Sequence, residues 1–251
     1  RPGAAVAFNF ISLDDMLGIV RAAELENVPV IIQVTQAALA HVGIDYMAAI
    51  GIAAARTARV PVCLHLDHTT DFALIMQGIK LGFSSVMIDA STLTYEENVK
   101  ATRRVVDAAH SVGVSVEAEL GRIGGREDNV TGKGQAWLVD PDQAEQFIAE
   151  TGIDALAPSV GTVHGLYTGT PVVRFDLIRA ISERVDTPLV LHGGSDLPDG
   201  VVQEAIRSGI RKFNVGTDLR IAHARALKRL FDGVSEVGAP HALAARQAGI
   251  E

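Results

Sequence analysis

Short apolar runs alternate with amphipathic stretches eight times along this chain, and no other feature restricts its fold as strongly. An apolar run bounded by polar residues is typical of a buried strand, and the stretches between the runs have helical spacing. We predict strands at residues 4–10, 29–35, 62–68, 85–91, 115–121, 155–161, 189–195 and 212–217. The predicted helices are at 12–26, 37–58, 71–81, 95–112, 141–151, 175–184, 201–208 and 218–231.

Unbroken alternation of strand and helix indicates a parallel sheet, and eight units indicate an α/β protein whose sheet closes into a (β/α)8 TIM barrel. The main alternative is an open, doubly wound sheet, which needs a glycine-rich phosphate turn after its first strand. The chain has Phe8, Asn9 and Phe10 there. The length of 251 residues predicts one domain over residues 1–251, and the start at Arg1 without Met suggests that terminal residues are missing.

Composition narrows the classes of partner. The formal net charge of -8 argues against a nucleic acid or an anionic membrane surface as partner, although a small anionic substrate needs only local donors. We expect no membrane span, because no apolar run reaches the roughly 18 residues that one requires. Cys63 is the single cysteine, which excludes an intrachain disulfide and favours a reducing, cytoplasmic location.

Polar residues gather at the predicted carboxyl ends of the strands, where a βα barrel carries its chemistry. Each one alone is equally an ordinary strand end in contact with water, so their combination matters. They are Asp67 and His68 on the third strand, Asp89 on the fourth, Glu119 on the fifth, His164 after the sixth, His192 on the seventh, and Asn214 with Thr217 on the eighth.

Three histidines, His68, His164 and His192, are among these residues. Neutral imidazoles that converge from three strands can hold a zinc ion and leave one position open for substrate, as in catalytic zinc sites. A metal held in this way polarises a carbonyl, and Asp67 beside a ligand can transfer a proton. His65 shares a strand face with Asp67, where it either orients the site or is an ordinary buried histidine. Three unrelated polar strand ends are the alternative to a metal site.

The last two strands are followed by small, donor-rich turns. His192-Gly193-Gly194-Ser195 follows the seventh strand and Asn214-Val215-Gly216-Thr217 the eighth, which is where βα barrels commonly bind phosphate. Glycine lets the backbone approach an anion, and the two hydroxyl groups can donate to it. A glycine after a strand is often only a turn, so the pair of turns carries the prediction.

Six motifs then resemble a single enzyme family. They are HLDHT at 65–69, MIDAS at 87–91, VEAELGRIGGRED at 116–128, VGTVHGLY at 160–167, LHGGSDLPD at 191–199 and KFNVGTDLR at 212–220. In collinear order over nearly the whole chain, they are similar to the class II, zinc-dependent ketose-bisphosphate aldolases, most of all the fructose- and tagatose-bisphosphate branch. The resemblance implies a homodimer or homotetramer of carbohydrate metabolism, such as glycolysis. It also implies reversible cleavage of a ketose 1,6-bisphosphate to dihydroxyacetone phosphate and glyceraldehyde 3-phosphate, through an enediolate that zinc stabilises.

The resemblance also implies roles for individual residues. His68, His164 and His192 are the implied ligands of one catalytic zinc ion, and Asp67 is the implied catalytic acid/base. The implied groups that hold dihydroxyacetone phosphate are Gly165, Gly193, Gly194, Ser195, Asn214, Val215, Gly216 and Thr217.

Three carboxylates complete the implied site. Glu127, in the polar loop at residues 122–140, matches a catalytic acid that exchanges the proton at the ketose carbon. We expect this long loop to be a mobile lid. Asp89 and Glu119 match carboxylates near an alternative position for the metal, or for a second metal or a monovalent cation.

The chain departs from the family pattern in three places. Asp196 stands where many members have glycine, Gly216 where the longer fructose-type enzymes have aspartate, and residues 33–43 are atypical after Thr35. A carboxylate beside phosphate would repel it. We therefore expect the Asp196 side chain to point outward and to cap the helix that follows.

Three rival functions stay open from the residues. A Schiff-base aldolase needs a lysine at a strand tip, whereas Lys212 begins its strand and Lys133 is in the loop. A zinc hydrolase usually needs a His-x-His pair on an early strand, where this chain offers Asn9. A non-catalytic sugar-phosphate-binding barrel would not need Asp67. Fructose and tagatose bisphosphates, which are epimers at C4, both fit the motifs.

Overall fold

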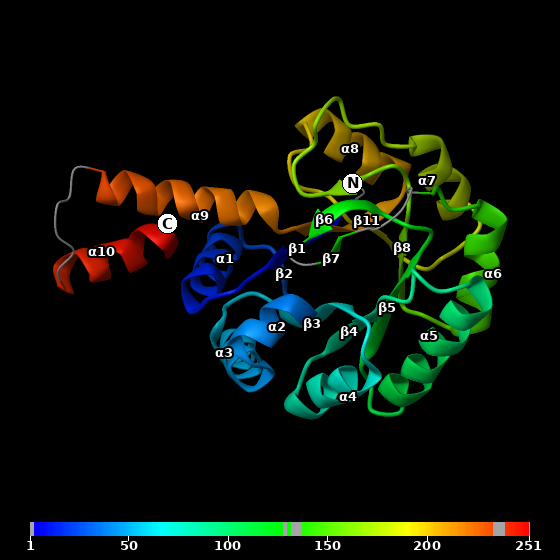
Figure 1. The fold of residues 1–251 in the computed structure, drawn as a ribbon, viewed down its shortest axis with the longest axis horizontal. Helices are drawn as coiled ribbons and strands as arrows, with labels where there is room; N and C mark the ends of the chain where they lie inside the picture. The colour runs from blue at the N-terminus through cyan, green and yellow to red at the C-terminus, as the bar shows by residue number, and fades with distance from the viewer. Residues whose placement is uncertain (1–2, 128–129, 132–136, 233–238, 251) are drawn as a thin grey trace.

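The computed structural model describes residues 3–127, 130–131, 137–232 and 239–250 (Figure 1). Eight parallel strands form a closed barrel in the order β1-β11-β10-β8-β5-β4-β3-β2. Closure comes from β1, which pairs with β2 on one side and with β11 on the other. The predicted (β/α)8 barrel is confirmed, whereas the single domain over residues 1–251 stays a prediction. The barrel strands are β1 (Ala5–Asn9), β2 (Val30–Thr35), β3 (Val62–Thr69), β4 (Ser85–Ile88), β5 (Ser115–Leu120), β8 (Ala155–Pro158), β10 (Leu189–Leu191) and β11 (Ile210–Val215).

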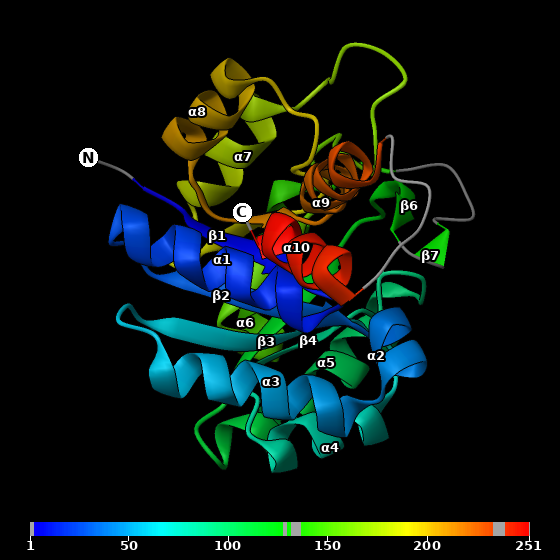
Figure 2. The same cartoon turned by 90° about the vertical axis from the view of Figure 1, so that its left-hand side faces the viewer.

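Helices surround the barrel, and α9 and α10 form a pair that lies beside α1 (Figures 1 and 2). Several begin at side-chain caps, as at Ser12, whose hydroxyl accepts from Asp15 N, and at Thr94, which forms a capping box with Glu97. The helices are α1 (Leu13–Glu26), α2 (Gln36–Val42), α3 (Ile44–Thr57), α4 (Phe72–Leu81), α5 (Tyr95–His110), α6 (Pro141–Thr151), α7 (Phe175–Ser182), α8 (Asp199–Ser208), α9 (Thr217–Phe231) and α10 (Ala239–Ile250).

Several predicted elements differ in the structure. The single helix at 37–58 is wrong, because the chain bends by 108° between α2 and α3 at Gly43, whose φ of 96° is not helical. The sixth and seventh strands end early, at Pro158 and Leu191, because Gly161 and Gly193 adopt left-handed φ values soon afterwards and turn the backbone out of the ladder. The fourth strand also ends early, at Ile88, where Asp89 accepts from Ser91 N in a local turn. Among the described residues no single helix is long and apolar enough to cross a membrane, and only the bent pair α2–α3 passes such a test together.

The predicted loop at 122–140 contains regular structure that its polar, glycine-rich sequence did not suggest. Strand β6 (Gly124–Glu127) pairs with β7 (Val130–Thr131) and, in parallel, with β9 (Val163–His164). Gly125 is the register partner of His164, and a Cβ added to Gly125 would lie within 3 Å of that residue's backbone. The start of the loop is therefore tied to the segment that carries His164.

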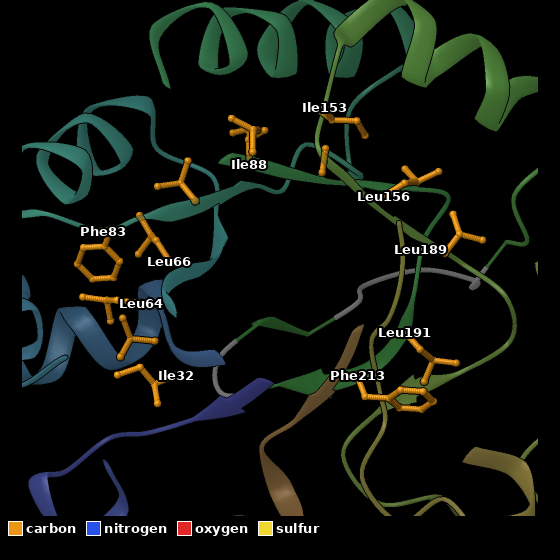
Figure 3. Packing of buried hydrophobic residues seen from close by; sticks show 14 of the residues in the cluster. Ile32, Leu64, Leu66, Phe83, Ile88, Ile153, Leu156, Leu189, Leu191 and Phe213 are labelled. Carbon is orange, nitrogen blue, oxygen red and sulfur yellow. The ribbon is translucent and has the colours of Figure 1, made fainter. Parts of the chain in front are cut away.

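The core between the barrel and its helices determines which strand residues face inward. Ile32, Leu64 and Leu66 point from their strands toward the helices (Figure 3). Leu64 lies against Gly51 of α3, where an added Cβ would come within 2.5 Å of a Leu64 methyl group, and Leu66 lies against Gly78 of α4. Side chains alternate along a strand, so His65, between these leucines, faces the barrel interior.

Candidate active site

Three histidine rings converge at the carboxyl end of the barrel. His68 is on β3, His164 is on β9, and His192 follows β10. Their ring centroids lie 4.6 to 5.8 Å apart, and each offers a nitrogen within 4.8 Å of those of the other two. This spacing matches one metal ion with three imidazole ligands and an open position. The structure thus brings together the three histidines that were predicted as ligands.

An irregular backbone places Asp67 and His68 on the same side of β3. Consecutive side chains of a regular strand point to opposite faces. His68 instead has a φ of 44°, a conformation rare for a residue with a side chain, and the β3–β4 register shifts between Leu66 and Thr69. Both side chains are consequently buried at the mouth of the barrel. Left-handed non-glycine residues are costly and concentrate at functional sites.

The His68 ring is oriented by a carboxylate. Its Nδ1 lies 2.9 Å from Asp89 Oδ2, and the other oxygen of Asp89 accepts from the backbone N and the hydroxyl of Ser91. Burial raises the pKa of Asp89, but the hydrogen bonds from His68 and Ser91 outweigh it and hold the pKa well below its ordinary value. A carboxylate that accepts at Nδ1 leaves Nε2 as the nitrogen for a metal.

His192 is also oriented by a carboxylate, but through Nε2 instead of Nδ1. Its Nε2 lies 2.9 Å from Glu117 Oε1. Its Nδ1 is buried, has no hydrogen-bond partner among the described residues, and belongs to the three-histidine group. Burial and the neighbouring His68 lower the pKa of His192, which favours the neutral ring that binds metals. A buried nitrogen left without a hydrogen bond beside two further imidazoles fits a metal ion.

A second group of possible ligands shares His68. Asp89 and Glu119 also offer atoms within 4.8 Å of one another and of His68. Burial, and then the charge of Asp89, raise the pKa of Glu119 well above its ordinary value. A bound cation would offset that repulsion, so these residues can form an alternative metal position.

Asp67 lies at the centre of a buried network of amides. Asn9 donates to its Oδ2 over 2.8 Å and Gln33 over 3.1 Å, while Asn214 donates to Oδ1 over 3.3 Å. These amides come from β1, β2 and β11, and Gln33 also donates to Asn9. The carboxylate is thereby held in one orientation next to the three histidines.

Beneath this layer Lys212 and Glu117 form a buried ion pair. Lys212 Nζ lies 2.6 Å from Glu117 Oε2. Burial raises the pKa of Glu117, but the charge of Lys212 and the hydrogen bond from His192 hold it well below its ordinary value. The prediction that Lys212 begins its strand is wrong, because β11 begins at Ile210 and Lys212 is its third residue. The Lys212 side chain reaches into the barrel, where its amine contacts a carboxylate and does not present a nucleophile at a strand tip.

The two glycine-containing turns lie next to each other. Gly194 N donates to Asn214 O. The hydroxyl oxygen of the buried Ser195 accepts from Asp218 N. The hydrogen of that hydroxyl group can still donate to a ligand. Gly216 is the N-cap of α9 and contributes no side-chain cap, so amides at this helix start can face an anion. Arg220, one turn into α9, donates to the hydroxyl of Thr217 over 3.3 Å and brings a positive charge to the turn.

The expected role of Asp196 is half correct. Its side chain is exposed, but it accepts from Tyr167 N and does not cap α8, which begins after Pro198 without a side-chain cap. The reason is the left-handed φ of 61° at Asp196, which directs the carboxylate toward the segment after β9. Tyr167 in turn donates its hydroxyl to Gly193 O, so this segment, which includes Gly165, lies against the turn after β10.

Glu127 is the last residue of β6, and its side chain lies outside the described part of the chain, as do Gly132, Lys133 and Gly134. Its role and the lid remain predictions.

The model of the class-II fructose-bisphosphate aldolase family matches residues 2–249. The chain belongs to this family. It is therefore a lyase of a family that generally depends on a metal, in agreement with the three-histidine group. Sulfofructosephosphate aldolase of Alkalicoccus urumqiensis is 42% identical over 241 residues, which cover 95% of this chain and 84% of that protein. D-tagatose-1,6-bisphosphate aldolase subunit GatY of Klebsiella oxytoca is 43% identical over 243 residues, which cover 96% and 85%.

A solved structure supports the same family. The crystal structure of a putative fructose-1,6-biphosphate aldolase from Coccidioides immitis superposes with a TM-score of 0.88 at 32% identity, covering 100% of this chain and 89% of that one. The fold of the whole chain is therefore similar to that of this solved structure.

Sequence reasoning assigned no role to several residues of the site. Gln33 and Glu117 are polar residues within apolar strands, and this mismatch was the available signal for both. Asn9 entered the predictions only as evidence against a phosphate turn and against a His-x-His pair, and Arg220 only as part of a motif. Tyr167 was also only part of a motif, because its contact with Gly193 depends on how two loops meet.

Proposed function

We propose that this aldolase reversibly cleaves a ketose 1,6-bisphosphate, of fructose or tagatose, to dihydroxyacetone phosphate and glyceraldehyde 3-phosphate. The observation that carries the proposal is the position of the buried carboxylate of Asp67, held by three amides, beside three converging imidazoles. That arrangement combines a site for a metal with a proton-transfer group, the two elements that cleavage next to a carbonyl requires.

His68, His164 and His192 would hold one zinc ion, with Asp89 and Glu117 orienting the first and last of these rings. Zinc supplies a Lewis acid that polarises the substrate carbonyl and stabilises negative charge during cleavage. Asp89 and Glu119 would provide the alternative position for this ion or hold a second cation.

Asp67 would take the proton of the C4 hydroxyl group when the C3–C4 bond breaks. Asn9, Gln33 and Asn214 donate to both of its oxygens, so the carboxylate keeps one orientation while it acts as base. In the reverse direction the protonated Asp67 would return this proton to the forming hydroxyl. Glu127 would exchange the proton at the ketose carbon, carried there by the loop that begins at β6.

The phosphate of dihydroxyacetone phosphate would lie between the turn after β10 and the start of α9. Backbone amides and the hydroxyls of Ser195 and Thr217 donate to it, and Arg220 adds a positive charge. The substrate-binding residues are then Gly165, Gly193, Gly194, Ser195, Asn214, Val215, Gly216 and Thr217, with Arg220 as an addition.

Three further parts of the proposal concern the whole protein. It acts in the cytoplasm, consistent with a single cysteine, as a homodimer or homotetramer in carbohydrate metabolism such as glycolysis. The alternative to a ketose bisphosphate as substrate is a different phosphorylated ketose, because a relative with 42% identity is named a sulfofructosephosphate aldolase.

A coupled assay of triose-phosphate release tests the proposal directly. Fructose 1,6-bisphosphate, tagatose 1,6-bisphosphate and sulfofructose phosphate are each offered to the zinc-loaded protein, to the protein after a chelator, and to the protein after zinc is restored. We expect cleavage of one of the bisphosphates, its loss with chelator and its return with zinc. Full activity without metal, or binding without cleavage, would contradict the proposal, and cleavage of the sulfonate alone would replace its substrate.

A further inference from the structure

A layer of ionisable side chains lies inside the barrel, directly beneath the layer that contains Asp67. His65, Glu117 and Lys212 each precede a residue of the upper layer by two positions along a strand, namely Asp67, Glu119 and Asn214. Side chains two apart share a strand face, so these three point into the interior beneath the site. All three are at most 7% exposed. Branched apolar residues normally fill this position in a βα barrel.

The contacts of this layer converge on Glu117. Its Oε2 accepts from Lys212 Nζ at 2.6 Å and lies 3.8 Å from His65 Nε2, while its Oε1 lies 2.9 Å from His192 Nε2. His65 is held from its other side by the hydroxyl of Ser85. Glu117 therefore reaches across the interior, past β8, to the ring that follows β10 and to the ammonium on β11.

A buried ion pair is a poor device for stability alone, because removing two charges from water costs as much as their attraction returns, or more. The carboxylate of this ion pair also accepts a hydrogen bond from the His192 ring, which an apolar residue could not do. A carboxylate is only an acceptor, so the Nε2 beside it must carry the hydrogen of the ring, and Nδ1 is left with a lone pair. That Nδ1 faces the histidine group.

We propose that Glu117 is a positioning residue that selects the tautomer and orientation of His192, and that Lys212 anchors Glu117 by holding its second oxygen. The inference rests on the proposed role of His192 as a metal ligand. Carboxylates in this place typically change metal affinity by about 10- to 100-fold when they are replaced. Asp89 acts on His68 from the opposite nitrogen, so the two rings are oriented by separate carboxylates.

Zinc affinity and the spectrum of the cobalt-substituted protein test this role without recourse to activity. Glu117→Gln leaves Lys212 unpaired, so the Glu117→Gln/Lys212→Met double variant, which removes both charges, is the second test protein. Zinc affinity is measured by competition with a chromophoric chelator, and apo-protein melting reports folding. We expect zinc affinity to fall about 10- to 100-fold in both variants and the cobalt spectrum to change. Lys212→Met alone should melt below the double variant, because it leaves a carboxylate buried without its cation.

Two controls separate positioning from stability. Glu24→Gln makes the same substitution in the surface ion pair with Arg59 and should leave zinc affinity and the cobalt spectrum unchanged. Thr151→Val removes a buried hydrogen bond to Phe147 O within α6, a helix outside the barrel, and should lower the melting temperature without changing zinc affinity.

The possible outcomes are distinct. Zinc binding by the double variant as tight as that of the wild type, or failure of both Glu117 variants to fold as apo-proteins, would overturn the positioning role. Equal melting of Lys212→Met and the wild type would overturn the anchoring by Lys212. If the wild-type protein itself binds no zinc, the proposed function fails, whereas tight wild-type binding that Glu117→Gln leaves unchanged rejects only this inference.

Discussion

Asn9 donates its side-chain amide to Asp67 across the mouth of the barrel, over 2.8 Å between Nδ2 and Oδ2. The two residues are 58 positions apart and come from strands that are not neighbours, since β2 lies between β1 and β3. Gln33, on that intervening strand, donates to both of them. Asp67 is thus held as an acceptor from several sides, which suits a carboxylate that takes up a proton at a fixed position.

Asp67→Ala should separate proton transfer from metal binding. We expect turnover to fall by about 100-fold or more, the scale for a proton-transfer group, while zinc content and the Michaelis constant change little. Steady-state kinetics with metal analysis measure these quantities. Asp71→Ala, which removes the N-cap of α4 on the surface, is the matched control and should keep full turnover. Loss of zinc together with activity would make Asp67 a ligand or a structural residue.

Replacing any histidine of the group should remove the metal. His68→Ala, His164→Ala and His192→Ala each leave two imidazoles, and a three-ligand site has no spare ligand. We expect the zinc content per chain to drop to near zero after gel filtration, as measured by atomic absorption. His110→Ala, in the exposed pair with Asp154, should keep its zinc. Retention of zinc by two of the three variants would exclude the three-histidine site.

The phosphate turn should distinguish two adjacent residues. Ser195→Ala should raise the Michaelis constant, because it removes a hydroxyl donor at the start of α9. Asp196→Gly should leave it nearly unchanged, since the carboxylate is exposed and bound to Tyr167 N, and glycine tolerates a φ of 61°. Substrate titrations of both variants give the comparison. Tenfold tighter binding after Asp196→Gly would show that the carboxylate opposes the substrate.

Cys63 should react slowly in the folded protein. Burial raises the pKa of its thiol above the ordinary value of 9.0. A raised thiol pKa means that the folded state favours the protonated form. The contribution of the Cys63 thiol to the free energy of unfolding is therefore complete at pH values below the pKa of the unfolded chain. It is lost as the pH rises through the pKa of the folded protein. We expect alkylation by iodoacetamide at pH 8 to be slower than in the urea-unfolded chain, and the rate to rise with pH. Equal rates in the folded and unfolded chains would contradict this expectation, and Cys63→Ser gives the blank.

Gly51→Ala should destabilise the barrel. The added Cβ would lie 2.5 Å from a methyl group of Leu64. Overpacking of this kind destabilises a core by about 1–3 kcal/mol. The higher helix propensity of alanine stabilises by only roughly 1 kcal/mol, so the clash should dominate. Gly200→Ala is the control, because nothing lies within 4 Å of its added Cβ in α8. Urea unfolding of the apo-proteins should show a lower free energy of unfolding for Gly51→Ala only. Equal stability of the two variants would mean that α3 shifts to admit the methyl group.

The barrel and the strand ends that carry its chemistry could be predicted from the sequence. Hydrophobic periodicity is local, so eight strand–helix units, with His68 and His192 at strand ends, could be recognised from neighbouring residues alone. The break at Gly43 could not, because a glycine inside a helical pattern is often tolerated, and a bend depends on what the two halves pack against. Strand β6 lies in a polar stretch and pairs with β7 and with β9, and the β9 partner is more than 30 residues away in the sequence.

The contacts between residues of different strands could not be predicted from the sequence. The amides that hold Asp67 and the ion pair between Glu117 and Lys212 join strands that are far apart in sequence, and they meet only because the sheet closes with a particular register. The left-handed backbone at His68 then brings two consecutive side chains to one side. The spacing of residues in the sequence predicts which face a residue occupies in a regular strand. It does not predict a left-handed residue such as His68, or a partner across the barrel, because both depend on the packing of the whole molecule.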